Sequence, residues 1–518
     1  MARFINVNEQ TDLAAGEERA RRHDVFTFLW FLAALGAYVV HGFDGELTRD
    51  SSFYVYAGQE VAAGAAPYVE LMNRAGPLAH LLPALGVLLA NAVDIADVYG
   101  VRIVFWVIAA ATVPLVYRLA SAAFASRNAG HVAAAAMLCF TGYAAFATTG
   151  PQSKTPVATF IAWSLLLSVR HRWLAAGIVT GLATLTWQPV FFAAAPAALV
   201  ACWFAPGEAR GRARLKALLL YGLGGVLTLV ATSAYFVAMR AFPEFLDGFL
   251  LANAQYTEQS GIDGQWLAAW ELFTSGFTWS SWIFVVGFAL LTVFGLVALV
   301  PRQGEEARWV RASTLVLFAG LVGGSIWSYG VFNGYADAFL LLPIAALGFG
   351  ALVGRLSHGW ATLPSAVLAG VCAVAAVGAT AWDQWRTRND VLLTQQAATD
   401  AVFSRLPTDA TAITSQAPQP LALSGVRNIS RYQLFTNGMD VYIDENWPGG
   451  LEGYARWIAD QDATVLTTDH NGVPEWMRPA VRKEYVYVGR GPRFFVFVHE
   501  SVDPQTRAEI RDALDRLS

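Results

Sequence analysis

Long apolar segments separated by short basic loops recur from residue 25 to residue 382 of this 518-residue chain. A bilayer core needs about 20 apolar residues per helix, so each segment is a candidate membrane span. Only 14% of the residues are charged, against roughly 25% in soluble domains, and mean hydropathy is +0.43. We predict a mainly α, polytopic transmembrane protein of about eleven spans. The predicted spans are Val25–Phe43, Val101–Leu119, Ala129–Thr149, Thr155–Val169, Trp173–Leu185, Val190–Phe204, Ala217–Met239, Phe277–Val300, Ser313–Tyr329, Ala336–Val353 and Leu363–Trp382.

The positions of Lys and Arg predict the orientation, because short cytoplasmic loops carry an excess of both. The basic stretches are Arg19–Arg22, Arg118–Arg127, Arg170–Arg172, Arg210–Lys216, Arg302–Arg311 and Arg355. All of these basic stretches lie on the cytoplasmic side if the apolar segment Pro77–Ala90 does not cross the membrane. We therefore interpret that segment as a juxtamembrane or re-entrant helix. Residues 1–24 then form a cytoplasmic tail, residues 25–382 the membrane domain, and the C-terminus lies outside. We expect a multi-pass protein of a bacterial plasma membrane.

The segment 383–518 has globular composition and predicts a small extracytoplasmic α/β domain. Helical patterns cover Asp390–Leu406, Leu451–Gln461 and Pro504–Leu517, the last with Asp503 as N-cap. Strand patterns cover Ala412–Thr414, Thr464–Thr467, Tyr485–Val488 and Phe494–His499, the last two joined by a hairpin turn at Gly489–Pro492. The aromatic residues of this domain are interpreted as its core, with sugar stacking as the alternative; they are Tyr432, Tyr442, Trp447, Tyr454 and Trp457.

Two classes of chemistry find no support. The formal net charge is -4 and no basic tract stands out, which gives no indication of a nucleic-acid partner. The cysteines Cys139, Cys202 and Cys372 all lie in apolar stretches and match no disulfide or metal motif. We expect no metal and no other cofactor.

The most informative polar sequence is the loop 44–76, which this topology places outside as the first external loop. It contains Asp50, then the aromatic pattern Tyr54–Gln59 at helical spacing, then Gly64–Tyr68 with its stiffening proline. Asp50 is therefore predicted to cap a helix that lies along the membrane surface.

An acidic residue after the first span, a Tyr-x-Tyr-Ala-Gly-Gln helix and a Gly-x-x-Pro-Tyr turn together resemble the polytopic GT-C glycosyltransferases. The protein O-mannosyltransferase-like and aminoarabinose-transferase-like branches are the most similar. The resemblance covers Asp50–Leu85 best and extends weakly through Arg102–Leu119, Leu174–Pro189 and Tyr335–Leu347.

The resemblance implies a polyprenyl-phosphate sugar as donor and an extracytoplasmic hydroxyl on a protein or cell-envelope glycan as acceptor. Transfer would proceed with inversion, with Asp50 as general base and a mild preference for mannose. A departing lipid phosphate needs fixed cations, and the predicted topology offers Arg49, Arg74 and Lys154. The substrate groove is predicted to include Tyr54, Tyr56, Tyr68, Glu70, Asn73, Gln152 and Asp337.

The sequence also departs from the family pattern. Many relatives have a second acidic residue where Ser51 stands, an Asp-His-Lys-Pro-Pro-like string where Asn73–Pro77 stands, and another acid where Gln152–Lys154 stands. These changes leave the donor and the phosphate ligands open and argue against a carboxylate-bound metal.

Each of these residues also has a structural interpretation. Asp50 can be a helix cap, Arg74 an interfacial anchor, and Glu70 a solvated loop charge. The tyrosines fit an aromatic belt, and Asp337 fits a helix N-terminus.

Two other functions stay open from the sequence. A transporter or lipid flippase is the main alternative, although transporters usually keep ionisable groups near the bilayer midplane. Here the polar residues lie mostly at the ends of the predicted spans. A non-catalytic membrane anchor that presents the C-terminal domain to a partner is the other.

Overall fold

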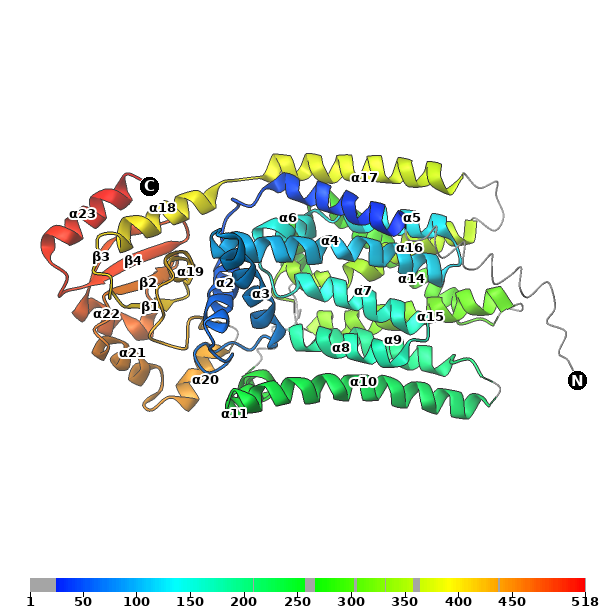
Figure 1. Cartoon of the computed structure of the whole chain (residues 1–518), viewed down its shortest axis with the longest axis horizontal. Coiled ribbons are helices and arrows are strands. Elements are labelled where there is room, and N and C mark those ends of the chain that lie inside the picture. The colour runs from blue at the N-terminus through cyan, green and yellow to red at the C-terminus, as the bar shows by residue number, and fades with distance from the viewer. Residues whose placement is uncertain are drawn as a thin grey trace, which may run out of the picture.

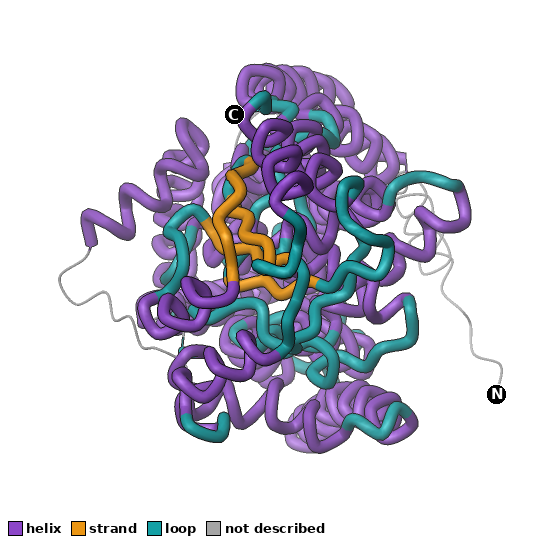
Figure 2. Tube along the Cα trace, turned by 90° about the vertical axis from the view of Figure 1, so that its left-hand side faces the viewer, coloured by secondary structure: helices purple, strands orange, loops and turns teal. Residues whose placement is uncertain are grey.

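The chain, described by a computed structural model, divides into a long helix bundle and a smaller sheet-containing domain at one end of it (Figure 1). The structure describes residues 25–207, 209–256, 266–301, 305–330, 332–356, 364–436 and 438–517. Figure 2 looks along the bundle from the domain side and shows the four strands seated over the bundle end. The predicted tail, residues 1–24, lies outside the described residues.

The bundle consists of apolar helices that run side by side (Figure 1). They are Val25–His41, α4 (Asp97–Ala123), α5 (Arg127–Leu138), α6 (Thr141–Thr149), α7 (Thr155–Val169), α8 (Trp173–Thr186), α9 (Val190–Trp203), α10 (Arg210–Ala238), α14 (Ser281–Ala298), α15 (Glu305–Gly330), α16 (Leu342–Leu356) and α17 (Ser365–Thr387). Shorter helices near the domain end are α11 (Phe242–Leu246), α12 (Ala252–Tyr256) and α13 (Trp266–Phe277).

Glycines let several of these helices approach closely, as expected where helices associate in lipid. A Cβ on Gly348 of α16 would lie 1.9 Å from the carbonyl oxygen of Gly287 on α14. A Cβ on Gly177 of α8 would lie 2.0 Å from the carbonyl oxygen of Tyr221 on α10. Larger residues at these positions would push the helix axes apart.

The bundle has the surface of a membrane protein. Five helices among the described residues are long and apolar enough to span a bilayer, or six if the bent pair α5–α6 counts as one span. The most apolar window of α10 is only 17% buried within the protein, against 56% for α4, so α10 presents its apolar side chains to lipid. The prediction of an integral multi-pass membrane protein is confirmed.

Individual spans differ from the prediction. The predicted span Ala129–Thr149 is two helices bent by 64° at Cys139 and Phe140. The predicted span Ala336–Val353 begins as a 3-10 helix, η4 (Tyr335–Leu340), before α16. Hydropathy does not register such breaks, because the apolar composition continues through them.

Two helices lie across the end of the bundle rather than along it: α2 (Arg49–Ala62) and α3 (Leu78–Val93), which includes most of the segment Pro77–Ala90 (Figure 1). The N-cap of α2 is Thr48, whose side chain accepts a hydrogen bond from the amide of Ser51. The prediction that Asp50 is the cap is therefore wrong, because Thr48 has the extended backbone and the hydroxyl that capping requires. Asp50 lies in the first turn, with its carboxylate available for other contacts.

The C-terminal domain is a four-stranded mixed sheet with the order β1-β2-β4-β3. Its strands are β1 (Ala412–Ser415), β2 (Val465–Asp469), β3 (Tyr485–Gly491) and β4 (Phe494–His499), and its helices are α18 (Val391–Phe403), α19 (Gln419–Ser424), α20 (Met439–Asn446), α21 (Gly450–Asp460), α22 (Arg478–Glu484) and α23 (Pro504–Asp515). β1 and β2 are parallel, and β4 pairs antiparallel with both β2 and β3. The predicted strands, the hairpin and the Asp503 cap of α23 are confirmed. The turn itself falls later than predicted, because β3 pairs as far as Gly491.

The aromatic residues of this domain form its core, as interpreted from the sequence. Tyr432, Tyr442 and Tyr454 are buried, and Trp447 and Trp457 pack against Tyr454 with ring centroids 5.0 and 5.6 Å away.

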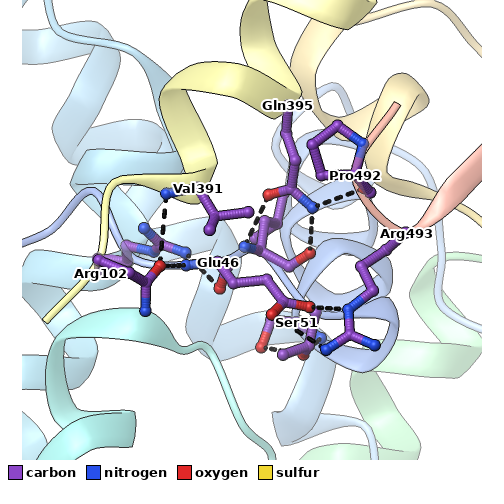
Figure 3. Close-up of polar contacts among 10 residues, drawn as sticks. Glu46, Ser51, Arg102, Val391, Gln395, Pro492 and Arg493 are labelled. Carbon is purple, nitrogen blue, oxygen red and sulfur yellow. Dashed lines mark hydrogen bonds and ion pairs between the residues drawn. The ribbon is translucent and has the colours of Figure 1, made fainter. Parts of the chain in front are cut away.

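Hydrogen bonds and an ion pair join the C-terminal domain to Glu46 and Leu47, just before α2 (Figure 3). The buried amide of Gln395 on α18 accepts from the backbone N–H of Leu47 at 2.9 Å and donates to the carbonyl of Leu47 at 3.0 Å. Arg493, in the β3–β4 turn, pairs with Glu46 at 2.8 Å. From the bundle side, the buried guanidinium of Arg102 donates to the carbonyls of Glu46 and Gly150. Glu46 and Leu47 are therefore held from both sides.

We expect Gln395→Leu to weaken this junction. The substitution leaves the N–H and C=O of buried Leu47 without their partner, at about 1–3 kcal/mol for each unsatisfied group. Thermal unfolding of the detergent-purified chain should show a clear fall in midpoint. Gln396→Leu is the control, because the half-buried Gln396 side chain donates to Asp400 on the same helix and weakly, at 3.5 Å, to the Leu423 carbonyl, and leaves no buried group of residues 46 and 47 unpaired; it should change the midpoint less.

Candidate active site

A cavity of about 180 Å³ lies where the bundle end, α2 and the C-terminal domain meet. It collects side chains from segments far apart in the sequence: Arg49, Asp50, Tyr54, Met72, Asn73, Arg74, Ala75, Gln152, Ser153, Lys154, Trp187, Gln188, Asn253, Leu434, Thr436 and Met439. Seven of the predicted site residues are among them: Asp50, the three cations, Tyr54, Asn73 and Gln152.

Asp50 and Arg49 form the acidic and basic pair at the start of α2. The Nε of Arg49 lies 3.2 Å from Oδ1 of Asp50, and the two side chains are 35% and 46% exposed. Arg49 also approaches the side-chain oxygen of Gln416 in the C-terminal domain at 3.5 Å. The carboxylate is thus accessible from the cavity and held beside a cation.

Arg74 enters the cavity from a loop that the bundle holds by its backbone. Its carbonyl accepts hydrogen bonds from the side-chain amides of Gln188, at 3.2 Å, and Asn253, at 2.8 Å. Its guanidinium donates to the carbonyl of Tyr256 at 3.0 Å. The neighbouring Asn73 closes the turn by accepting from the amide of Ala75. This loop is fixed by contacts with two separate segments, the start of the α8–α9 connection and α12.

Lys154 lies at the start of α7 and pairs with Asp337, whose side chain is only 3% exposed. The other carboxylate oxygen of Asp337 accepts from the backbone amides of Asn333 and Gly334, at 2.7 and 3.1 Å. The ammonium also lies 5.1 Å from the ring centroid of Trp187. Asp337 does not line the cavity itself, and its contact with the site is the ion pair with Lys154. Its side chain also caps the 3-10 helix η4.

Tyr54 forms a wall of the cavity and keeps its phenolic proton. Burial raises its pKa well above the usual value, and the nearby charge of Asp50 raises it further. The hydroxyl therefore stays neutral, and the side chains of Ser153 and Asn73 lie within hydrogen-bonding reach of it.

Besides Asp337, three predicted groove residues lie outside the cavity. The Tyr56 hydroxyl accepts from the amide of Asn428 at 2.8 Å, so it joins α2 to the C-terminal domain. Tyr68 is fully buried and donates to the carbonyl of Ala75 at 2.7 Å. Glu70 is exposed, and none of the three lines the cavity.

The sequence interpretation missed part of the lining. Trp187 and Gln188 follow α8, and Asn253 lies in α12; none of the three was predicted to line the site. Leu434, Thr436 and Met439 come from the C-terminal domain, about 380 residues after Asp50 in the chain, and no local pattern indicates such a contact. Within the described residues, no group of three or more His, Cys, Asp or Glu is arranged to hold a metal ion.

The fold is similar to that of two solved membrane glycosyltransferases of the GT-C type. The chain is similar to the crystal structure of ArnT from Cupriavidus metallidurans bound to undecaprenyl phosphate, with a TM-score of 0.58 and 14% identity over 92% of this chain and 98% of that one. It is also similar to the apo oligosaccharyltransferase of Archaeoglobus fulgidus, with a TM-score of 0.50 and 14% identity over 93% of this chain and 75% of that one. The resemblance inferred from the first external loop is thus confirmed at the level of the fold. No protein-family model matches the sequence, and a search of curated proteins gives no match.

Proposed function

We propose that the protein transfers a sugar from a polyprenyl phosphate to a hydroxyl group of an extracytoplasmic acceptor. One observation carries the proposal: Asp50, Arg74 and Lys154, from three separate segments, line a single cavity at the end of a GT-C-like bundle. A carboxylate and fixed cations in one cavity are what inverting transfer from a phosphate leaving group requires.

In the proposed reaction, Asp50 takes the proton of the acceptor hydroxyl as that oxygen attacks the anomeric carbon. The bond between the anomeric carbon and the phosphate oxygen breaks, and polyprenyl phosphate leaves. Arg49, Arg74 and Lys154 stabilise the negative charge on the departing phosphate. Gln152, Asn73 and the Tyr54 hydroxyl contact the sugar or the phosphate.

The proposed topology places this cavity outside the cytoplasm. The proposed topology has about eleven spans. This number includes shorter apolar helices, which can cross the bilayer only together with flanking residues or where the bilayer is locally thinner. Residues 25–382 form the membrane domain and residues 383–518 an extracytoplasmic domain. Cysteine-accessibility mapping at position 50 tests the orientation, and labelling from the cytoplasmic side would contradict it.

Binding of a polyprenyl phosphate is supported by the similar ArnT structure, which contains undecaprenyl phosphate. The C-terminal domain contributes Leu434, Thr436 and Met439 to the cavity and is proposed to cover the site and to meet the acceptor. Mannose as the transferred sugar stays a prediction from the first-loop resemblance alone.

The function is tested by mass spectrometry of extracellular glycoconjugates from cells with and without this protein. Loss of one sugar modification, restored by the intact gene, is the expected result. Substrate uptake into proteoliposomes without any sugar transfer would instead favour a transporter or flippase.

Arg74→Gln is expected to weaken binding of undecaprenyl phosphate about tenfold, because a charge-assisted hydrogen bond contributes about 1.5–3 kcal/mol. Binding can be followed by native mass spectrometry in detergent. The control is Arg240→Gln, which removes an exposed arginine outside the cavity. Equal weakening by both variants would show that net charge, and not the cavity, controls binding.

A further inference from the structure

A second cavity, of about 730 Å³, lies at the opposite end of the bundle from the candidate active site. The same helices reach both places. α7 follows Lys154 at the active site and ends at Val169 in the second cavity, and α9 follows Gln188 and ends at Trp203 there. At 1.5 Å of rise per residue the two cavities are roughly 20 Å apart, so they are separate sites.

The second cavity is basic. Its lining includes Arg210, Arg214 and Arg308 together with His171, and none of its described lining residues is acidic. The arginines come from the starts of α10 and α15, two helices that are not consecutive in the chain. Three glutamates are near these arginines in the sequence, and their side chains lie outside the described part of the chain: Glu208, two residues before α10, and Glu305 and Glu306, the first two residues of α15.

The helix ends at this cavity also favour an anion. α10 begins at Arg210 without a side-chain cap, so its first amides are donors at the positive end of the helix dipole. The C-terminal ends of α7 and α9 would oppose this, but their carbonyls are engaged. The Ser168 carbonyl accepts from the amide of His171, and the Trp203 carbonyl accepts from Nε of Arg214 at 2.9 Å.

Aromatic rings make up the rest of the cavity and point to a lipid rather than a free ion. The guanidinium of Arg214 lies 3.7 Å from the ring centroid of Trp203, whose side chain is largely exposed at the bundle surface. Trp309 packs against His171 with centroids 5.4 Å apart. Tryptophan is typical of the membrane–water interface, where one part of a ligand is apolar and another is charged.

We propose that this cavity binds the phosphate headgroup of an anionic membrane lipid. The phosphate would lie between Arg210, Arg214 and the first amides of α10, with the acyl chains along the apolar walls. The positive-inside rule explains arginines that extend from a span end to the surface. It does not explain why three of them line one cavity together with Trp203, which lies against Arg214, and Trp309, which lies edge-on to His171.

The test uses the full-length chain in detergent and native mass spectrometry with phosphatidylglycerol and, as the zwitterionic comparison, phosphatidylcholine. Phosphatidylglycerol should be retained in preference to phosphatidylcholine. Arg210→Gln should weaken that retention about tenfold, as expected for the loss of one charge-assisted contact. Arg212→Gln is the matched control, because Arg212 is exposed two residues further along α10 and does not line the cavity.

Equal weakening by the two variants, or equal retention of the two lipids, would overturn the proposal. A second arm compares sodium phosphate with sodium chloride at the same ionic strength in lipid-free micelles. One result would identify free phosphate, and not a lipid, as the ligand of this cavity. In that result, phosphate raises the unfolding midpoint of Arg212→Gln but not that of Arg210→Gln, and phosphatidylglycerol changes neither midpoint.

Discussion

Asp50→Asn is expected to reduce sugar transfer by about 10²- to 10⁴-fold, the usual contribution of a general base. The amide has nearly the shape of the carboxylate but cannot take the acceptor proton. The fold should survive, because the Asp50–Arg49 pair is about half exposed and such pairs contribute about 0–1 kcal/mol. The measurement is the initial rate of transfer from a polyprenyl-phosphate sugar by the purified protein.

Glu70→Gln is the matched control, since Glu70 is an exposed carboxylate of the same loop that does not line the cavity. It should keep the wild-type rate. A normally folded Asp50→Asn protein with full activity would remove Asp50 from the mechanism, whereas the fold assignment would stand.

Asp337→Ala is expected to destabilise the protein by about 3 kcal/mol, at the lower end of the range for breaking a buried ion pair. The lower end applies because Lys154 is 21% exposed and water can partly solvate it. The substitution also leaves the amides of Asn333 and Gly334 without their acceptor. The free energy of unfolding can be measured by titration with a denaturing detergent.

Lys154→Met should cost less than Asp337→Ala, because the carboxylate keeps its two amide donors. The double variant Lys154→Met/Asp337→Ala should lose less stability than the sum of the two single variants, since each removes the same interaction. Additive losses would show that the two side chains do not interact in the folded protein.

Features with a local cause could be predicted from the sequence. The strands and the hairpin of the C-terminal domain follow from alternating apolar residues and a glycine-rich turn, and the structure contains them. The loop motif and the distribution of Lys and Arg predict three site residues on the same side of the membrane: Asp50, Arg74 and Lys154. The cavity confirms that they lie together, although their chemical roles remain proposals.

Features that depend on distant contacts could not be predicted. Thr48 and not Asp50 caps α2, a choice between neighbouring polar residues that backbone geometry decides. Asp337 is bound to Lys154, 183 positions away in the chain, and sequence spacing does not indicate such a partner. Tyr56 and Tyr68 match the aromatic pattern of the loop, but burial directs them into packing and not into the cavity.

The double attachment of Glu46 and Leu47 has a consequence for engineering. Because Gln395 and Arg493 hold the segment that leads into α2, the position of Asp50, the proposed general base, depends on residues near the end of the chain. A version cut at residue 382 would keep most of its membrane helices but lose the contacts that hold the segment before Asp50. Adding the missing domain back as a separate polypeptide should therefore restore turnover only if the two pieces dock.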